Sequence, residues 1–277
     1  MSGTMKKFLT TLVLAGCTIG CGSEVTGPES NLIVRFRSGL AEANLAAGGG
    51  STAANALALG IAGTNGTLVL DEIRVVVAEF ELKITGDCPR EEDDDDGNGG
   101  GGDGDRRGCG KFETPPAFIT LPLEEDVVPV VQQDVPAGIY SSIEFEVEDL
   151  RIDKDGEEGN TELAELLAVI RTEFPDWPDQ ASMLATGTFT PTDGVAVPFR
   201  VYFDADIRIR MSFVPPMIVE ADEAGAVVDI TVDPRFWFFH GNGTVTDLSA
   251  LDFDATGELV EFNFAMKDGF VRADHHH

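Results

Sequence analysis

An acidic, glycine-rich segment near residue 100 is the first part of this 277-residue sequence with the composition of a binding site. Eight acidic side chains lie between Glu91 and Asp105. Hard cations prefer several oxygen ligands on a tightly turning chain, and part of the segment follows the D-x-D-x-N-G order that begins a calcium loop. Glycine stands where such loops carry an apolar residue, which favours a solvated low-complexity loop instead. The calcium ligands would be Asp94, Asp96, Asn98 and Asp105.

Two of the four cysteines bracket this segment. Cys88 and Cys109 enclose 20 residues. In an exported protein the environment permits such a pair to form a disulfide, which stabilises the fold by up to ~3 kcal/mol in the chain-entropy model. We therefore predict a bridge that closes an acidic loop over residues 88–109. Cys21 is then left over, either free or paired between chains.

Residues for nucleophilic or metal-assisted catalysis are scarce. Of the four histidines, His275–His277 are adjacent at the end of the sequence and would bind transition metals only weakly. His240 is the one remaining imidazole, so a Ser-His-Asp or Cys-His arrangement has little to be built from. The H-E-x-x-H, G-x-S-x-G and P-loop patterns do not occur in the sequence. We predict a protein that is not an enzyme.

Four consecutive aromatic residues, Phe236–Phe239, form a candidate binding surface. A strand cannot turn all four to one side. We expect either a glycan platform built on Trp237 and Phe239, with Trp177 nearby, or rings that fill the core between two sheets.

Arginines and carboxylates share one face of an alternating pattern between residues 200 and 210. They are Arg200, Asp204, Asp206, Arg208 and Arg210. This face would either bind a partner or form a cross-strand ladder of ion pairs.

The first 17 residues have the order of an export signal. Lys6 and Lys7 precede an uncharged apolar stretch, Phe8–Gly16, as in a secretory signal peptide. The last part, Leu14-Ala15-Gly16-Cys17, resembles the lipobox of bacterial lipoproteins. That resemblance implies cleavage before Cys17 and lipid attachment to it, with Cys21 as the alternative site.

The same resemblance implies a location. Residues 1–16 would be the signal peptide and residues 17–30 a polar tether. Thr18 would become the second mature residue, which is similar to lipoproteins sorted to the outer membrane of diderm bacteria. Each buried CH₂ of an acyl chain contributes ~0.8 kcal/mol, so a multiply acylated cysteine anchors stably. We expect a protein anchored by lipid to the outer membrane or cell surface.

Composition excludes several classes of protein. The chain has 49 acidic and 19 basic residues, for a formal net charge of −30, and would repel the phosphates of nucleic acid. Its 43% of apolar residues is too high for a wholly disordered protein. Beyond the signal, no apolar run approaches the ~18–20 residues that a membrane-spanning helix needs.

Alternating apolar residues predict β-strands along most of the chain. Asn65-Gly66 suits a hairpin turn, and a change of phase at Ala78 predicts a bulge. The longest pattern, Phe199–Phe213, exceeds a usual strand, so we expect it to bend or to switch sheets. Predicted strands cover residues 31–38, 57–62, 67–77, 80–84, 143–148, 199–213, 227–232 and 259–266.

One helix is predicted. Leu163, Leu166, Leu167 and Ile170 have helical spacing, with Thr161 as a candidate N-cap and Pro175 as a stop. Many strands with one short helix predict a mostly β fold, an antiparallel β-sandwich. The helix divides the chain into a first sandwich half over residues 31–160, a helix and connector over 161–180, and residues 181–277. The last part would be a second half or a second small domain.

A turn motif links the sequence to a known group. Val135-Pro136-Ala137-Gly138-Ile139-Tyr140, followed by alternating residues 141–149, resembles the L-P-A-G-x-Y turn of a family of uncharacterised bacterial lipoproteins. Residues 218–221, leading into the alternating residues 228–232, resemble a later segment of that family. The resemblance covers residues 31–233 discontinuously and implies a transthyretin- or immunoglobulin-like sandwich of unknown function. It implies no catalytic residues.

These features predict an exported, lipid-anchored envelope protein with a non-enzymatic structural or binding role. The alternatives are a calcium- or glycan-binding surface module and a subunit of a surface fibre. The expected partners are the membrane, through the lipid, and a protein or glycan, but no nucleic acid. No cofactor is expected apart from the candidate calcium ion.

Overall fold

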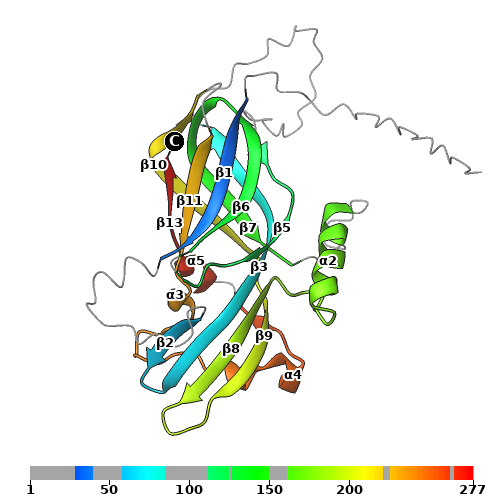
Figure 1. Ribbon diagram of the computed structural model, residues 1–277, viewed down its shortest axis with the longest axis vertical. Helices are drawn as coiled ribbons and strands as arrows, with labels where there is room; N and C mark the ends of the chain where they lie inside the picture. The colour runs from blue at the N-terminus through cyan, green and yellow to red at the C-terminus, as the bar shows by residue number, and fades with distance from the viewer. Residues whose placement is uncertain are drawn as a thin grey trace, which may run out of the picture.

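The computed structural model describes residues 29–39, 58–84, 112–124, 126–149, 161–220, 225–262 and 265–276. These residues are mostly β, arranged as two facing sheets (Figure 1). The strands are β1 (Glu29–Ser38), β2 (Leu59–Gly63), β3 (Gly66–Ile84), β4 (Phe112–Glu113), β5 (Ala117–Thr120), β6 (Val127–Pro136), β7 (Gly138–Val147), β8 (Met183–Pro191), β9 (Val197–Asp204), β10 (Ile207–Val219), β11 (Ala226–Val232), β12 (Val260–Glu261) and β13 (Phe270–His276). The helical segments are α2 (Thr161–Glu173), α3 (Arg235–Phe238), η1 (Leu248–Leu251), α4 (Phe253–Thr256) and α5 (Ala265–Gly269).

The predicted mostly β sandwich is confirmed, but its sheets are not purely antiparallel as the sequence predicted. The smaller sheet has the order β13-β11-β1-β6, and the larger has the order β10-β7-β3-β8-β9-β12 with β2, β4 and β5 also paired to β3. Most neighbours are antiparallel, but β1 and β11 pair in parallel, as do β9 and β12. The sheets are therefore mixed.

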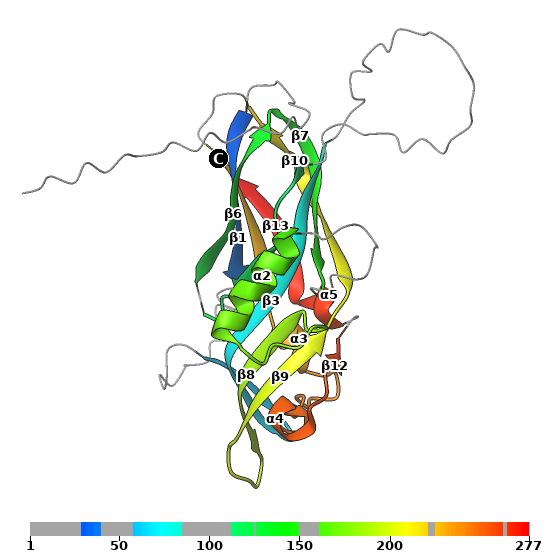
Figure 2. The same cartoon turned by 90° about the vertical axis from the view of Figure 1, so that its right-hand side faces the viewer.

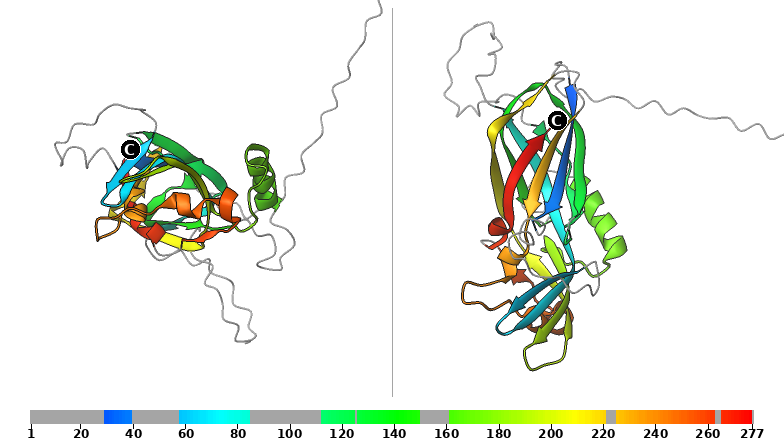
Figure 3. Two further views of the ribbon diagram at one scale, coloured as in Figure 1. Left: turned by 90° about the horizontal axis from the view of Figure 1, so that it is seen from below. Right: turned by 60° about the vertical axis from the view of Figure 1, so that its left-hand side comes forward.

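The 19-residue strand β3 runs the length of the elongated molecule (Figures 1 and 3). At the upper end of Figure 1, where β13 finishes, the smaller sheet faces β7, β10 and part of β3. The lower end holds β2, β8, β9 and the other part of β3. The pairing of β3 with β7 shifts register between Val77 and Glu79, which confirms the predicted bulge at Ala78.

Strands from both predicted parts of the chain share each sheet. In the smaller sheet β1 pairs with β11, and in the larger sheet β3 pairs with β8. The division at residues 160 and 181 remains a prediction, and these pairs show only that the two parts are joined along their strands.

The long apolar alternation over residues 199–213 bends rather than switching sheets. Its inward-facing residues are buried throughout, but the strand breaks at Ala205-Asp206. The first part, β9, pairs with β8, and the second part, β10, pairs with β7 in the same sheet. The alternation keeps its phase across the break, so one continuous pattern supplies core residues to both ends of the molecule.

Helix α2 lies against the outer face of the larger sheet (Figure 2). Leu167 and Ile170 are buried there in a cluster with Trp177 and Tyr202. The helix ends at Glu173, two residues before Pro175. The predicted helix and its stop are thus confirmed.

Residues 259–266 were predicted to form one strand, and that prediction is wrong for most of the range. Among its described residues, 259–262 and 265–266, only Val260 and Glu261 pair with a neighbouring strand, and the short helix α5 begins at Ala265. Apolar runs this short do not distinguish a strand from a buried helical turn.

The predicted hairpin forms between β2 and β3, one residue earlier than the Asn65-Gly66 pair implies. Gly63 pairs with Gly66, so Thr64 and Asn65 make the two-residue turn. The Asn65 amide accepts a hydrogen bond from the Val245 N–H at 2.9 Å and donates one to its carbonyl at 2.8 Å. This contact ties the hairpin to the loop that follows α3.

The motif turn at residues 135–140 joins the two sheets. Strand β6 of the smaller sheet ends at Pro136, and β7 of the larger begins at Gly138. The buried Tyr140 hydroxyl donates a hydrogen bond to the Pro136 carbonyl at 2.7 Å, which closes the corner. This hydrogen bond explains why the motif has a tyrosine four residues after Pro136.

Alkaline titration tests how tightly the two tyrosines are held. The chain has two tyrosines, both fully buried, and burial raises the pKa of Tyr140 and of Tyr202 to about 12. Because an unfolded tyrosine ionises near pH 10, their stabilising contribution is complete below pH ~10 and is lost as the pH rises towards 12.

We therefore expect the tyrosinate absorbance at 295 nm to appear together with the loss of the β-type circular dichroism signal. A tyrosine that titrates with a midpoint near pH 10 while that signal stays intact would contradict the described burial.

Candidate functional site

The arginine face predicted from residues 200–210 is, at β10, a ladder of ion pairs. Glu144 of β7 is buried, with its carboxylate 3.0 Å from Lys83 Nζ, 3.2 Å from Arg208 Nε and 3.9 Å from Arg210 Nε. Arg208 also contacts Glu146, and this hydrogen bond raises the pKa of Arg208. These side chains link the neighbouring strands β3, β7 and β10.

Arg200 does not join that ladder, because the break after β9 places it at the other end of the sheet. It contacts Asp176 at 2.5 Å and also Asp254, and its guanidinium lies 5.7 Å from the centre of the Tyr202 ring. Arg200 thus holds α4 and the segment after α2 against β9.

The terminal histidines described by the structure lie in β13. His276 Nε2 is 3.2 Å from Arg35, which binds the buried Asp229 through bonds of 2.6 and 2.8 Å. The bond with Asp229 raises the pKa of Arg35. His275 Nε2 is 2.9 Å from the Pro215 carbonyl of β10. Among the described residues no group of three or more His, Cys, Asp and Glu side chains is placed to hold a metal ion.

The two residues predicted to form the glycan platform differ in exposure: Trp237 is buried and Phe239 is exposed. Trp237 is buried, and its indole N–H donates to the Met266 carbonyl at 2.8 Å. Its ring therefore cannot stack on a sugar in this structure. Phe239 is 46% exposed and Phe236 is 56% exposed. Trp177 is also buried, in the cluster beneath α2.

The local conformation explains this division of the four aromatics. Residues 235–238 form a single helical turn, α3, rather than a strand. Asp233 accepts a hydrogen bond from the Arg235 N–H at 3.1 Å, and Pro234 precedes the turn. An Asp-Pro pair is a recognised signal for a helix start, and it could have been used to predict the turn from the sequence.

The exposed phenylalanines line a shallow pocket of about 360 Å³, which we call the aromatic pocket. Its polar wall is the ion pair between Arg235 and the buried Asp233, with an Nε–Oδ1 distance of 2.8 Å. The hydrogen bond with Asp233 raises the pKa of Arg235. The pocket thus combines aromatic surface with a fixed charged pair. It is lined by Gly60, Ile61, Ala62, Asp233, Arg235, Phe236 and Phe239.

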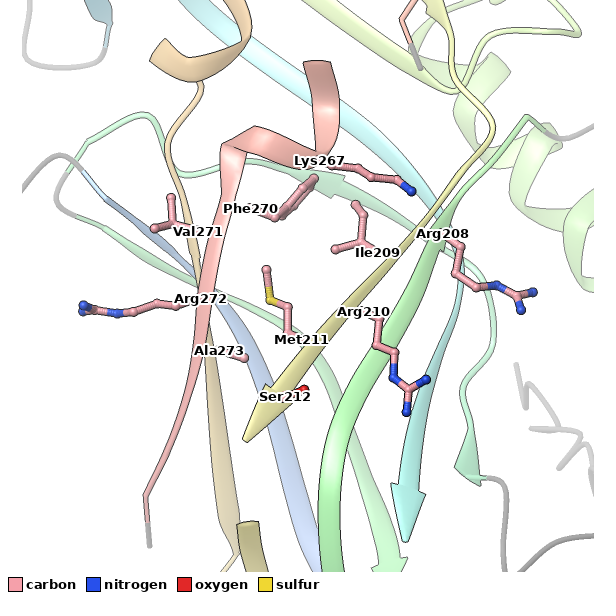
Figure 4. Close-up of a pocket in the computed structure, with 10 residues that line it drawn as sticks. All are labelled: Arg208, Ile209, Arg210, Met211, Ser212, Lys267, Phe270, Val271, Arg272 and Ala273. Atoms are coloured by element: carbon pink, nitrogen blue, oxygen red, sulfur yellow. The ribbon is translucent and has the colours of Figure 1, made fainter. Parts of the chain in front are cut away.

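A second opening, of about 520 Å³, lies between β10 and β13, and we call it the edge slot (Figure 4). Ile209, Met211 and Phe270 point into it and form its floor, and their exposures are only 4%, 8% and 6%. Lys267 of α5 lies at one end and Ser212 at the other. The slot therefore lies over the edge of the sandwich core, between two strands that do not pair with each other.

The remaining sequence-predicted sites lie outside the described residues. They are the lipidation site Cys17, the disulfide Cys88–Cys109 and the calcium ligands Asp94, Asp96, Asn98 and Asp105. Among the helices that the structure describes, none is long and apolar enough to cross a membrane. The edge slot could not be predicted from the sequence, because no local pattern shows that β10 and β13 are neighbouring edges of two sheets.

Comparisons with known proteins add one distant similarity. Neither a protein-family model nor a curated protein matches the sequence. Among solved structures, MbnP from Methylosinus trichosporium is similar over 76% of this chain and 77% of that chain, with 13% identity and a TM-score of 0.34. At that level the similarity supports no statement about ligand or activity.

Proposed function

We propose that this protein is an exported, lipid-anchored protein of the cell envelope, with a sandwich that binds a partner without catalysing a reaction. The anchoring part is supported by the charged, apolar and lipobox-like order of residues 6–17. The turn motif at residues 135–140 further supports membership of the uncharacterised lipoprotein family. Its buried Tyr140 corner gives the motif a physical role at the junction of the sheets.

The position of β1 is consistent with display from a membrane. Glu29 begins β1 at the upper end of Figure 1, whereas the β2–β3 and β8–β9 turns lie at the lower end. A chain anchored at Cys17 would thus reach the fold at the upper end and present the lower end outwards. The tether between them has 11 residues, which span at most ~40 Å when fully extended.

The edge slot is the observation that carries the binding part of the proposal. Soluble sandwiches normally cover or charge the edges of their sheets, and concave openings with an apolar floor and a few polar groups are where ligands usually bind. Here the floor is continuous with the core, and the three arginines that line the slot, Arg208, Arg210 and Arg272, form ion pairs with neighbouring carboxylates. Such an opening suits a ligand that fills it.

The aromatic pocket favours a second candidate, a glycan. Sugars commonly stack on exposed aromatic rings and take hydrogen bonds from charged side chains. Phe236 and Phe239 would supply the rings, and the Asp233–Arg235 pair would supply the polar contacts. The calcium site predicted in the acidic segment stays a prediction.

Metabolic labelling with palmitate tests the anchor. We expect the wild-type protein to incorporate label in a globomycin-sensitive manner and Cys17→Ala to lose the label completely, because the lipid is attached to that thiol. Cys21→Ala is the matched control and should label like the wild type. A Cys17→Ala protein that still labels, or loss of label in Cys21→Ala alone, would reject Cys17 as the lipid site.

A further inference from the structure

We propose that the edge slot binds an extended, acidic polypeptide segment, which adds as a strand between β10 and β13. The inference rests on the proposed binding function and names the class of partner for it. Backbone pairing would supply affinity, and the apolar floor would select alternate side chains, as in other cases of strand addition.

The backbone edges of both strands are available on the side of the slot. Among the strands that the structure describes, β10 ends the larger sheet with β7 as its one neighbour, and β13 ends the smaller sheet with β11 as its one neighbour. Their unpaired edges flank the slot (Figure 4). An extended segment lying between them would have N–H and C=O groups to meet on at least one side.

The floor has the spacing of an extended strand. Ile209 and Met211 are two residues apart on β10 and both point into the slot, and Phe270 and Ala273 face them from β13 (Figure 4). Side chains of an incoming strand also repeat every two residues. Alternate apolar side chains of the partner would therefore rest on the floor while the others stayed in solvent.

The slot is closed at both ends, which limits the length of the partner. At one end His275 contacts the Pro215 carbonyl at 2.9 Å, and its ring centre is 5.5 Å from that of Phe213. At the other end stands α5 with Lys267. The free stretch of β10 is thus about residues 207–212, which at ~3.3 Å per residue suits a segment of about six residues.

The charge around the slot favours an acidic partner. Four of its ten lining residues are Arg or Lys and none is Asp or Glu, in a chain with 49 acidic and only 19 basic residues. The three arginines point away from the slot (Figure 4) and are paired, Arg208 and Arg210 with Glu144 and Glu146, and Arg272 with Asp274 at 2.7 Å. The charge available to a partner is therefore that of Lys267. Lys267 forms no ion pair with any described carboxylate, and it is exposed. An acidic residue of the partner would give Lys267 the counter-charge that the described chain does not provide.

Fluorescence anisotropy with a labelled peptide tests this proposal on the full-length protein in detergent. The probe alternates valine with glutamate, and the comparison peptide carries lysine in place of glutamate. Ala273→Trp fills the slot and should weaken binding of the acidic probe about tenfold or more, since a filled pocket cannot accept the strand. Lys267→Glu, at an exposed position, should weaken it several-fold because it reverses the charge that faces the probe.

Val197→Trp is the matched control. Val197 is 43% exposed in β9 and is not among the residues that line the slot, so this variant should bind like the wild type. Equal binding by all variants, tighter binding of the lysine peptide, or no binding below ~1 mM would overturn the proposal. So would a dimer that Ala273→Trp disrupts and the acidic probe does not, because a second copy would then be the occupant. None of these results alters palmitate labelling, so the anchor is judged separately.

Discussion

Gly187→Ala will destabilise the protein by ~3 kcal/mol or more, the upper end of the cost of overpacking. A Cβ atom at Gly187 would lie 2.0 Å from the Val69 carbonyl oxygen of β3 and 2.9 Å from Cζ of Phe199 in β9. The carbonyl belongs to the backbone of a central strand, so it cannot swing aside as the end of a flexible side chain could. Equilibrium unfolding in urea measures the loss.

Gly60→Ala is the control for this prediction. Gly60 also lies in a strand paired with β3, but a Cβ atom there meets no heavy atom within 4 Å. We expect its free energy of unfolding to stay within ~0.5 kcal/mol of the wild type. Equal losses in the two variants would mean that β3 and β8 do not approach as closely as described.

Trp237→Ala will cost ~3–5 kcal/mol of stability, the usual range for removing a large buried aromatic. The Trp237 ring centre lies 5.7 Å from that of Phe270 and 6.3 Å from that of Phe262. Its loss would also leave the Met266 carbonyl without the indole N–H that it accepts. The measurement is the same urea unfolding.

Two neighbouring variants separate the core role of Trp237 from a surface role of the aromatics. Phe236→Ala and Phe239→Ala remove exposed rings and should change stability by less than ~1 kcal/mol. On a glycan array these two variants should lose any signal that the wild type gives at the aromatic pocket. A Trp237→Ala protein as stable as Phe236→Ala would show that Trp237 does not belong to the core.

Local sequence patterns predicted the elements whose periodicity is continuous and whose ends carry clear signals. The spacing from Leu163 to Ile170, with Pro175 beyond it, indicated α2 because both the buried face and the stop are local features. The phase change at Ala78 indicated the bulge for the same reason. Successive side chains of a strand point to opposite faces, so a shift in the apolar alternation requires an extra residue.

Elements that depend on distant contacts were not predicted. The alternation keeps its phase through Ala205-Asp206, so it gave no indication that the chain stops pairing with β8 there and pairs with β7 afterwards. Gly187 lies in an ordinary alternating run, and its need for a hydrogen atom in place of Cβ arises from β3 and β9. A lone glycine in a strand indicates a close approach only once its neighbours are known.

The same limit applies to the candidate sites. The exposure of Phe236 and Phe239 follows from one helical turn, α3, whose Asp-Pro start is visible in the sequence. The edge slot follows from sheet order, because β1 and β11 pair in parallel across more than half the chain and so place β13 at the edge beside β10. Strand order of this kind results from packing the whole core.

Mass spectrometry of the protein extracted from membranes is the most direct test of the central claim, that this sandwich works from a lipid anchor at the envelope. The account predicts that the N-terminal peptide begins at residue 17 and carries the mass of a diacylglyceryl group, with or without a further acyl chain, on Cys17. A mature protein that begins at an unmodified residue, or one whose lipid is on Cys21, would contradict it.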